Sequence, residues 1–349
     1  MQANDLIVNE KVKDSLLWQG LERLPHALLL IGPPGVGKRD FAEQLVALLL
    51  CEAVTPDMKA CGQCVACHWL ASGNHPDFRR IAPDGDDKET EETKSAKSGE
   101  KAKKQGAGII RIDQIRELED FVFVGSHRQA NRVVLITEAE AMQAAAANSL
   151  LKILEEPPSS VYFILVSSRQ KMLLPTLRSR CRVVPFTQPD RQAATNWLIK
   201  AGLEKQAARY LDLAGGAPLR VVQWKNEGQL AAIDTLLDSL LTSRTDPLAL
   251  AANWDALLKS NESFRLENLV EGIQRWLFDL TLARMGGEIH YHRGWPQPKR
   301  IETLDTAVLF AAWHEINAFR RSARHPLNQL LFLESLAFYY LRALQPHTP

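Results

Sequence analysis

The chain has 349 residues, of which 46% are hydrophobic and 24% charged, and its formal net charge is +1. This length predicts two or three domains, and the composition is that of a globular protein. The balanced charge argues against a dominant grip on nucleic acid by this chain alone, without excluding a local basic patch. No apolar run approaches the roughly 18 residues that span a bilayer. Residues 1–5 lack the basic start and apolar core of a signal peptide, so we expect a cytoplasmic protein with reduced thiols.

Short apolar runs alternate with helical patterns over the first 190 residues. Residues 27–31, 132–137, 161–166 and 182–186 are predicted strands, and a helix with an apolar face follows the first of them. Continuous apolar strands separated by helices are typical of a parallel sheet that is covered on both faces. We therefore predict an α/β domain over residues 1–188.

The first predicted strand leads into a glycine-rich loop, GPPGVGKR, at residues 32–39. In a P-loop, with the pattern G-x-x-x-x-G-K-[ST], the glycines let the backbone wrap a phosphate and the lysine reaches the outer phosphates. Gly32, Gly35, Gly37 and Lys38 fit this role, but Arg39 stands where a hydroxyl should hold Mg²⁺. The loop therefore predicts a phosphate-binding fold, and a strand-to-helix turn without any ligand is the alternative.

Hydrolysis also needs an acidic pair at the end of a later strand, where an Asp supports Mg²⁺. Thr137 occupies the expected Asp position here, whereas Glu138 remains and has the carboxylate to orient a water. Two positions linked to Mg²⁺, 39 and 137, are thus altered together. We predict a vestigial site at which ATP binding stays open and hydrolysis is not expected.

Four of the five cysteines lie close together in the sequence, with the spacing C-x9-C-x2-C-x2-C. They are Cys51, Cys61, Cys64 and Cys67. In a reducing compartment this cluster indicates a metal more than disulfides, and four thiolates complete the tetrahedral shell of a structural zinc. We predict a zinc module over about residues 51–72, with His68 and His75 as competing ligands and a cluster of reduced core thiols or a redox pair as the alternatives. A zinc-dependent DNA-binding module is a further alternative, although Lys59 is the one basic side chain of the segment.

Residues 84–107 are rich in Lys, Glu, Asp, Thr, Ser, Ala and Gly and contain no aromatic or large aliphatic side chain. Such a stretch cannot bury enough apolar surface to offset the entropy of ordering it. We predict a disordered surface insertion, with a charged partner-binding tail as the alternative. From about residue 190 the strand signals fade. The pattern is then helical to the end, with a loop at the WPQP of residues 295–298.

Two longer motifs carry a family resemblance. Residues 144–158, AAAANSLLKILEEPP, and residues 174–181, LPTLRSRC, resemble the signatures of the clamp-loader family of AAA+ proteins. Together with the cysteine cluster they are similar to the delta-prime type of subunit in bacterial DNA polymerase III. The resemblance implies an AAA+ domain over residues 1–188, a helical lid over 189–229 and a helical collar, used for oligomerisation, over 230–349.

The resemblance also implies a function. Clamp-loader subunits form an open ring of five that uses ATP to open a sliding clamp and place it on primed DNA, and the delta-prime type is a rigid, non-hydrolysing member. The implied partners are the delta and gamma/tau subunits and, indirectly, the clamp and primed DNA, with no membrane. Arg39 and Thr137 agree with that role, but Lys38 and Glu138 leave residual nucleotide binding open. An active AAA+ ATPase is therefore the alternative.

In this family the arginine of the Ser-Arg-Cys motif serves a neighbouring subunit, and this role maps onto Arg180. An arginine finger neutralises the charge that builds on the γ-phosphate and is worth roughly 10³–10⁵ in rate. The alternative is a surface arginine that ends a helix. Cys181 has no partner in the sequence that would lower its pKa, and we expect a small core residue.

Two further positions carry sensor candidates of the AAA+ type. Ser167 and Ser168 follow a predicted strand, where AAA+ proteins place a polar residue that senses the γ-phosphate. Serines at strand ends are also common turn formers. Arg220, after the GGAP of residues 215–218, lies near the position of a second sensing arginine but is displaced by about one residue.

Overall fold

A computed structural model describes residues 7–18, 20–83, 108–123, 131–241, 246–294, 301–323 and 328–345. The predicted insertion at 84–107 and the predicted loop at 295–298 lie outside the described residues. The chain divides into two compact units, Met1–Asp190 and Arg191–Pro349. The finer division of the second unit into a lid over 189–229 and a collar over 230–349 stays a prediction.

The first unit contains a parallel sheet with the strand order β2-β3-β4-β1-β5. Its strands are β1 (Ala27–Ile31), β2 (Phe78–Ile81), β3 (Arg132–Ile136), β4 (Val161–Ser167) and β5 (Arg182–Pro185). The apolar pattern predicts four of these strands and misses β2. That strand lies at a sheet edge, and its two central residues, Arg79 and Arg80, are exposed.

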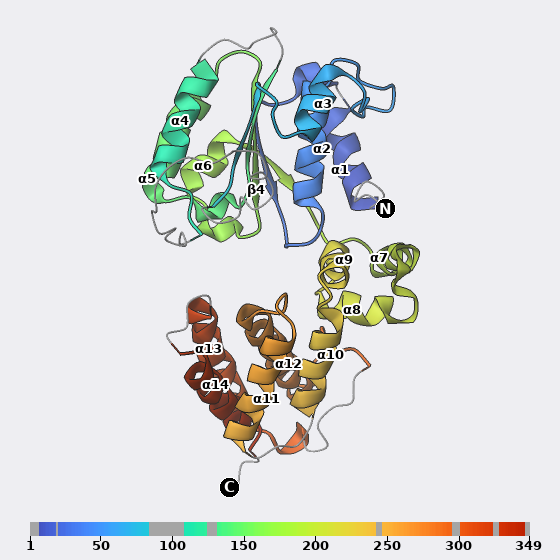
Figure 1. The fold of residues 1–349 in the computed structure, drawn as a ribbon, viewed down its shortest axis with the longest axis vertical. Helices are drawn as coiled ribbons and strands as arrows, with labels where there is room; N and C mark the ends of the chain where they lie inside the picture. Colours follow the sequence, from blue (N-terminus) through green and yellow to red (C-terminus); the bar gives the residue numbers. More distant parts are fainter. Residues whose placement is uncertain are drawn as a thin grey trace. The chain divides into compact units, whose positions relative to one another are not determined.

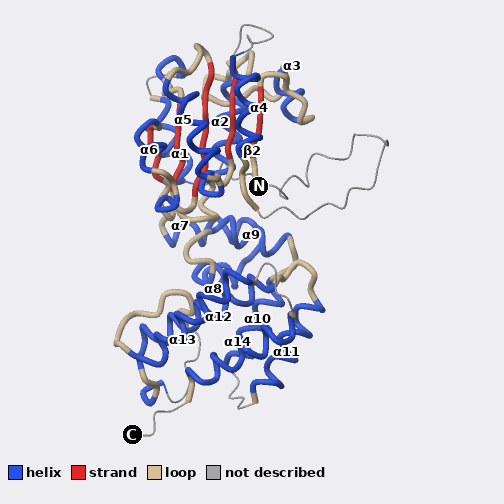
Figure 2. Tube along the Cα trace, turned by 90° about the vertical axis from the view of Figure 1, so that its left-hand side faces the viewer, coloured by secondary structure: helices blue, strands red, loops and turns tan. Residues whose placement is uncertain are grey.

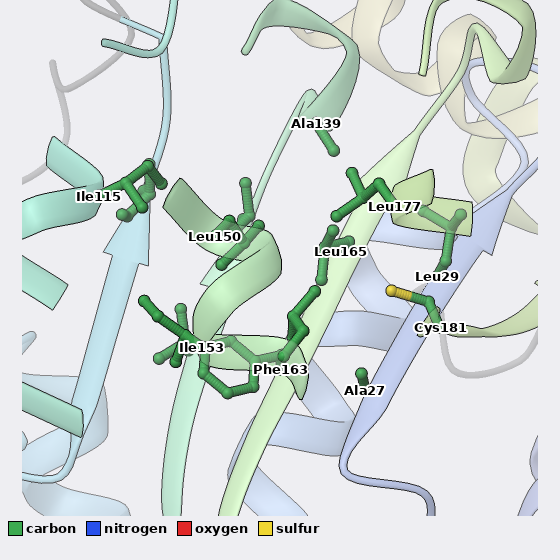
Figure 3. Packing of buried hydrophobic residues seen from close by; sticks show 14 of the residues in the cluster. Ala27, Leu29, Ile115, Ala139, Leu150, Ile153, Phe163, Leu165, Leu177 and Cys181 are labelled. Atoms are coloured by element: carbon green, nitrogen blue, oxygen red, sulfur yellow. The ribbon is translucent and has the colours of Figure 1, made fainter. Parts of the chain in front are cut away.

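Helices cover both faces of this sheet (Figure 1). One face carries α1 (Ile7–Leu17), α2 (Lys38–Leu50) and α3 (Val65–Ala71), and the other carries α4 (Ile112–Phe123), α5 (Ala144–Glu155) and α6 (Pro175–Arg180). Because side chains alternate along a strand, Leu28 and Leu30 of β1 pack toward α2, whereas Leu29 packs toward α5 and α6. Figure 3 shows Leu29 beside Phe163, Leu165 and Leu177 in the second of these cores.

The described residues of the second unit form helices and no strand (Figure 2). These are α7 (Arg191–Leu198), α8 (Ala207–Leu213), α9 (Pro218–Asn226), α10 (Leu230–Leu241), α11 (Pro247–Ser260), α12 (Leu266–Arg284), α13 (Thr306–Ser322) and α14 (Gln329–Ala343). Helix α11 packs on α14, and α12 packs on α13. Tyr340 of α14 is buried and donates a hydrogen bond to the carbonyl oxygen of Leu240, 2.8 Å away. None of the described helices has the length and apolar character to cross a membrane.

Candidate functional site

The glycine-rich loop joins β1 to α2 at the carboxyl edge of the sheet, in the predicted context of strand, loop and helix. Gly35 and Gly37 have φ angles of 76° and 93°, in the left-handed region that favours glycine. A Cβ atom at Gly32 would lie 2.3 Å from the carbonyl oxygen of Phe186. The three glycines matched in the sequence are therefore required by the backbone and the packing of this loop.

Lys38 begins α2, and its side chain is folded back onto the loop. The residue is only 5% exposed, and its Nζ atom donates hydrogen bonds to the carbonyl oxygens of Gly32 at 2.8 Å and Pro33 at 2.5 Å. Burial lowers the pKa of Lys38 to about 8, although the negative charge of Glu140 acts in the opposite direction. The lysine that would hold phosphate is thus engaged by groups of this chain.

The two altered Mg²⁺ positions also have partners of their own. Arg39 is half exposed and pairs with Glu43, one turn further along α2, with Nε and Oε1 3.4 Å apart. Thr137 is buried, and its hydroxyl donates to the carbonyl oxygen of Ile81 in β2 at 3.3 Å. Arg39 has no oxygen ligand to offer, and the hydroxyl of Thr137 is committed to the neighbouring strand.

The acidic run after β3 contains two carboxylates, Glu138 and Glu140, whose surroundings differ. Glu138 is exposed and has a left-handed backbone, with φ 50° and ψ 49°. Glu140 accepts a hydrogen bond from the backbone N–H of Ser168 at 3.1 Å. Its second oxygen, Oε2, is buried and has no hydrogen-bond partner in the described part of the chain. Since Ser167 is in register with Ile31, the residue before the loop, Glu140 lies at the carboxyl edge beside the glycine-rich loop.

Glu140 is not among the site residues that the sequence motifs predict. The sequence offers one indication of it, which is that Glu140 is an acidic residue in the TEAE run of residues 137–140, directly after β3. The short helix η3 (Ala139–Ala141) turns the chain there, and only this turn brings the side chain to Ser168.

The sensor candidates have local partners as well. The hydroxyl oxygen of Ser167 is buried and accepts from the N–H of Arg169 at 3.2 Å, which is the bond of a turn former. Arg220 of α9 pairs with both carboxylate oxygens of Glu271 in α12, and Arg275 pairs with the same carboxylate at 2.8 Å. Burial alone would raise the pKa of Glu271, but Arg275 and Arg220 outweigh it and lower that pKa. Arg220 therefore has a structural partner within the second unit.

The four clustered cysteines come together in space. The sulfur atoms of Cys51, Cys61, Cys64 and Cys67 all lie within 4.8 Å of one another, and those of Cys61 and Cys67 are 4.0 Å apart. Four thiolates at about 2.3 Å from a zinc ion would have their sulfur atoms about 3.8 Å apart, so the spacing fits a tetrahedral site. Helix α2 ends immediately before Cys51, and α3 begins immediately after Cys64.

Backbone N–H groups point at these sulfur atoms. Cys61 accepts from the N–H groups of Gln63 and Cys64 at 3.4 and 3.3 Å, which lower the pKa of its thiol. Burial raises the pKa of Cys64, but the N–H groups of Cys67 and Glu52 outweigh it and bring that pKa to about 6. Burial raises the pKa of Cys51 and that of Cys67, the latter to about 12, so the thiolate is favoured at Cys61 and Cys64 and not at the other two. The thiolate is the form that binds metal, and four sulfur donors suit a thiophilic ion.

The predicted histidine competitors are absent from this group of candidate ligands in the described residues. The ring of His75 stacks edge-on against Trp69, and its Nδ1 accepts from the backbone N–H of Asp77 at 3.1 Å.

Arg180 lies at the opposite edge of the sheet from the glycine-rich loop. It ends α6 two residues before Arg182, which begins β5 and is in register with Leu28 near the amino end of β1. The loop instead follows Ile31, at the carboxyl end of the same strand. At about 3.3 Å per residue, the three steps from Leu28 to Ile31 alone separate these levels by about 10 Å.

The guanidinium of Arg180 is held by two contacts. Its Nη1 donates to the carbonyl oxygen of Thr176 at 3.2 Å, and its Nη2 donates to Oε1 of Glu155, the last residue of α5. The side chain of Arg180 is one-third exposed. Cys181 is buried in the core beside Leu177, as predicted, and burial raises its pKa to about 11 (Figure 3).

Comparison with known proteins identifies relatives. The family described as "DNA polymerase III, delta subunit" matches residues 15–190. The DNA polymerase III subunit delta' of Pseudomonas aeruginosa is 36% identical over 69% of this chain and 70% of its own length. The subunits delta' of Escherichia coli and Bacillus subtilis are 31% and 33% identical, over 62% and 56% of this chain and 60% and 53% of their own lengths. A solved gamma subunit-related protein of Thermotoga maritima has a TM-score of 0.47 at 19% identity, covering 97% of this chain and 99% of its own. The chain belongs to the DNA polymerase III delta' subunit family.

Proposed function

We propose that this chain is a non-hydrolysing clamp-loader subunit that helps to load a sliding clamp onto primed DNA and lends Arg180 to the ATP site of a neighbouring subunit. One observation carries this proposal, namely the position of Arg180 relative to the glycine-rich loop. Arg180 is at the amino edge and the glycine-rich loop is at the carboxyl edge. This separation of Arg180 from its own loop supports a role at the ATP site of another molecule.

The chemistry of an arginine finger suits this residue. Phosphoryl transfer spreads negative charge over the γ-phosphate oxygens, and a planar guanidinium can contact two of them at once. Arg180 makes two hydrogen bonds to the residues that the structure describes, which leaves part of its five N–H donors for an external anion.

The glycine-rich loop supports the non-hydrolysing part of the proposal. Lys38 bonds to carbonyl oxygens of the loop, Arg39 pairs with Glu43, and Thr137 bonds to β2. An ATPase site of this type needs a hydroxyl at position 39 and an Asp at position 137 to hold Mg²⁺, whereas this chain has Arg39 and Thr137 there.

We assign a structural role to the metal that the four cysteines would hold. Four thiolates complete the tetrahedral shell of zinc and leave no open position for substrate. Cys51, Cys61, Cys64 and Cys67 would close the segment 51–72 around the ion, which stabilises a piece of chain with little core of its own.

The proposed partners are subunits of the delta and gamma/tau type, and the collar is the proposed contact. Helices α13 and α14 expose large apolar side chains, among them Phe310 and Leu331, each 61% exposed, and Phe338. Exposed apolar side chains gathered on neighbouring helices are common at surfaces that bind other proteins.

The test is an Arg180→Ala substitution in a ring reconstituted with delta and gamma/tau subunits. We expect the ring to assemble and the ATP site that receives Arg180 to slow by roughly 10³-fold, which lowers DNA-stimulated turnover. Arg178→Ala, an exposed arginine of the same short helix, is the matched control. Unchanged turnover in the assembled Arg180→Ala ring would refute the finger role, and ATP hydrolysis by the isolated chain that Lys38→Ala abolishes would support an active ATPase instead.

A further inference from the structure

The two family motifs of the first unit meet at a single ion pair. Glu155 is the last residue of α5 in the first motif, and Arg180 is the last residue of α6 in the second. Their side chains are joined through Oε1 of Glu155 and Nη2 of Arg180. The strands that follow these helices, β4 and β5, begin on either side of the amino end of β1. The pair therefore lies on the amino edge of the sheet.

This pair contributes little to the stability of the fold. The side chain of Glu155 is half exposed and that of Arg180 one-third exposed, and exposed ion pairs are weakened by water and salt. The Glu155 side chain lies outside the hydrophobic cores of the first unit. A contact that stabilises the fold so little can still restrict the rotamers of a long arginine side chain.

The geometry suits a finger that is held in place but left available. Arg180 ends a helix of only six residues, and among the described residues its guanidinium has Thr176 and Glu155 as hydrogen-bond partners. A guanidinium has five N–H donors, so two such bonds leave three for an anion. Without Glu155, Arg180 would keep only the hydrogen bond to the carbonyl oxygen of Thr176 out of these two. Its side chain would then sample more directions.

We propose that Glu155 is a positioning residue that orients Arg180 toward the γ-phosphate of the neighbouring ATP site. The proposal rests on the finger role proposed above for Arg180. Because positioning acts on the reaction and not on ATP binding, its loss lowers kcat and leaves KM for ATP unchanged.

The experiment is a set of substitutions in the reconstituted ring, with DNA-stimulated ATP turnover as the readout. Glu155→Ala should lower kcat about tenfold, with ring assembly and KM for ATP unchanged. Glu155→Asp, which keeps the charge on a shorter side chain, should restore part of the loss. Glu156→Ala is the matched control, because Glu156 is the adjacent exposed carboxylate, and it should behave as wild type.

A double substitution separates positioning from a general effect. In a ring that already carries Arg180→Ala, Glu155→Ala should produce no further loss, because the residue acts through Arg180. An unchanged or raised kcat for Glu155→Ala alone, or an equal loss in both backgrounds, would overturn the proposal. If Arg180→Ala lowers turnover and Glu155→Ala does not, the finger role stands and the positioning role fails. If Arg180→Ala itself has no effect, both fail.

Discussion

Replacing Glu140 by Gln should raise the affinity of the isolated chain for ATP. The substitution removes a negative charge beside the glycine-rich loop and keeps an oxygen that can accept from the N–H of Ser168. The negative charge of the Glu140 carboxylate acts to raise the pKa of Lys38. Its Oε2 atom is buried and has no hydrogen-bond partner in the described residues. A phosphate entering the loop would meet this fixed negative charge.

The size of the effect follows from Coulomb's law. A carboxylate and one unit of phosphate charge about 5 Å apart repel by about 3 kcal/mol at an effective dielectric constant of about 20. Glu140 is partly exposed, so water and salt reduce this repulsion. We therefore expect a gain in affinity on the order of tenfold to a hundredfold.

Isothermal titration of ATP with Mg²⁺ into the isolated chain measures this gain. Glu138→Gln is the control, since Glu138 is exposed and lies in the same acidic run. Lys38 has a pKa of about 8, and a bound anion would raise that pKa. Binding at pH 8 should then take up about half a proton, seen as a dependence of the heat on the ionisation enthalpy of the buffer. A Glu140→Gln chain that binds ATP no more tightly than wild type, or a Glu138→Gln chain that gains as much, would refute the reasoning.

Three further predictions concern the metal and the fold. Cys64→Ser should release zinc and leave the segment 51–72 open to proteases; native mass spectrometry that finds the metal retained would contradict the site. Gly32→Ala should lower the free energy of unfolding by about 2 kcal/mol, because the new Cβ meets the carbonyl oxygen of Phe186 at 2.3 Å, and an unchanged denaturation midpoint would exclude this clash. Glu271→Gln should destabilise the second unit by roughly 3 kcal/mol at pH 7, since it leaves two partly buried arginines without their carboxylate. Because the pKa of Glu271 is lowered in the folded chain, its contribution is present above the usual pKa of a glutamate. The difference from wild type should therefore shrink as the pH falls through the lowered value, and equal denaturation curves at pH 7 would disprove it.

The features that the sequence predicts well are local in the chain. The glycine-rich loop needs three glycines and a lysine within seven residues, and the structure shows the backbone reason for each glycine. The cysteine group lies within 17 residues, from Cys51 to Cys67, and two helix ends are enough to gather it. In both cases the spacing along the chain already fixes most of the geometry.

The features that the sequence does not predict depend on distant contacts. Strand β2 is half exposed at the edge of the sheet, so its apolar pattern is interrupted by Arg79 and Arg80. Glu140 reaches Ser168 only because β3 and β4 are neighbours. Glu155 reaches Arg180 across 25 positions of the sequence. A single sequence shows that these residues carry charge, but it does not show which distant group each of them will contact.

The structure also gives a physical reason for keeping a glycine-rich loop that does not have to turn over nucleotide. Gly32 lets the backbone approach Phe186, and Lys38 bonds to two carbonyl oxygens of the loop, so both residues hold β1, α2 and the end of β5 together. The loop can therefore serve as a structural connection in a chain that has Arg39 and Thr137 at the two positions linked to Mg²⁺. At the amino edge of the same sheet, Arg180 makes two hydrogen bonds to described residues, and a guanidinium has five N–H donors. The two proposed properties, a loop that does not hydrolyse ATP and an arginine finger at the other edge, are thus compatible within one domain, because different side chains determine each.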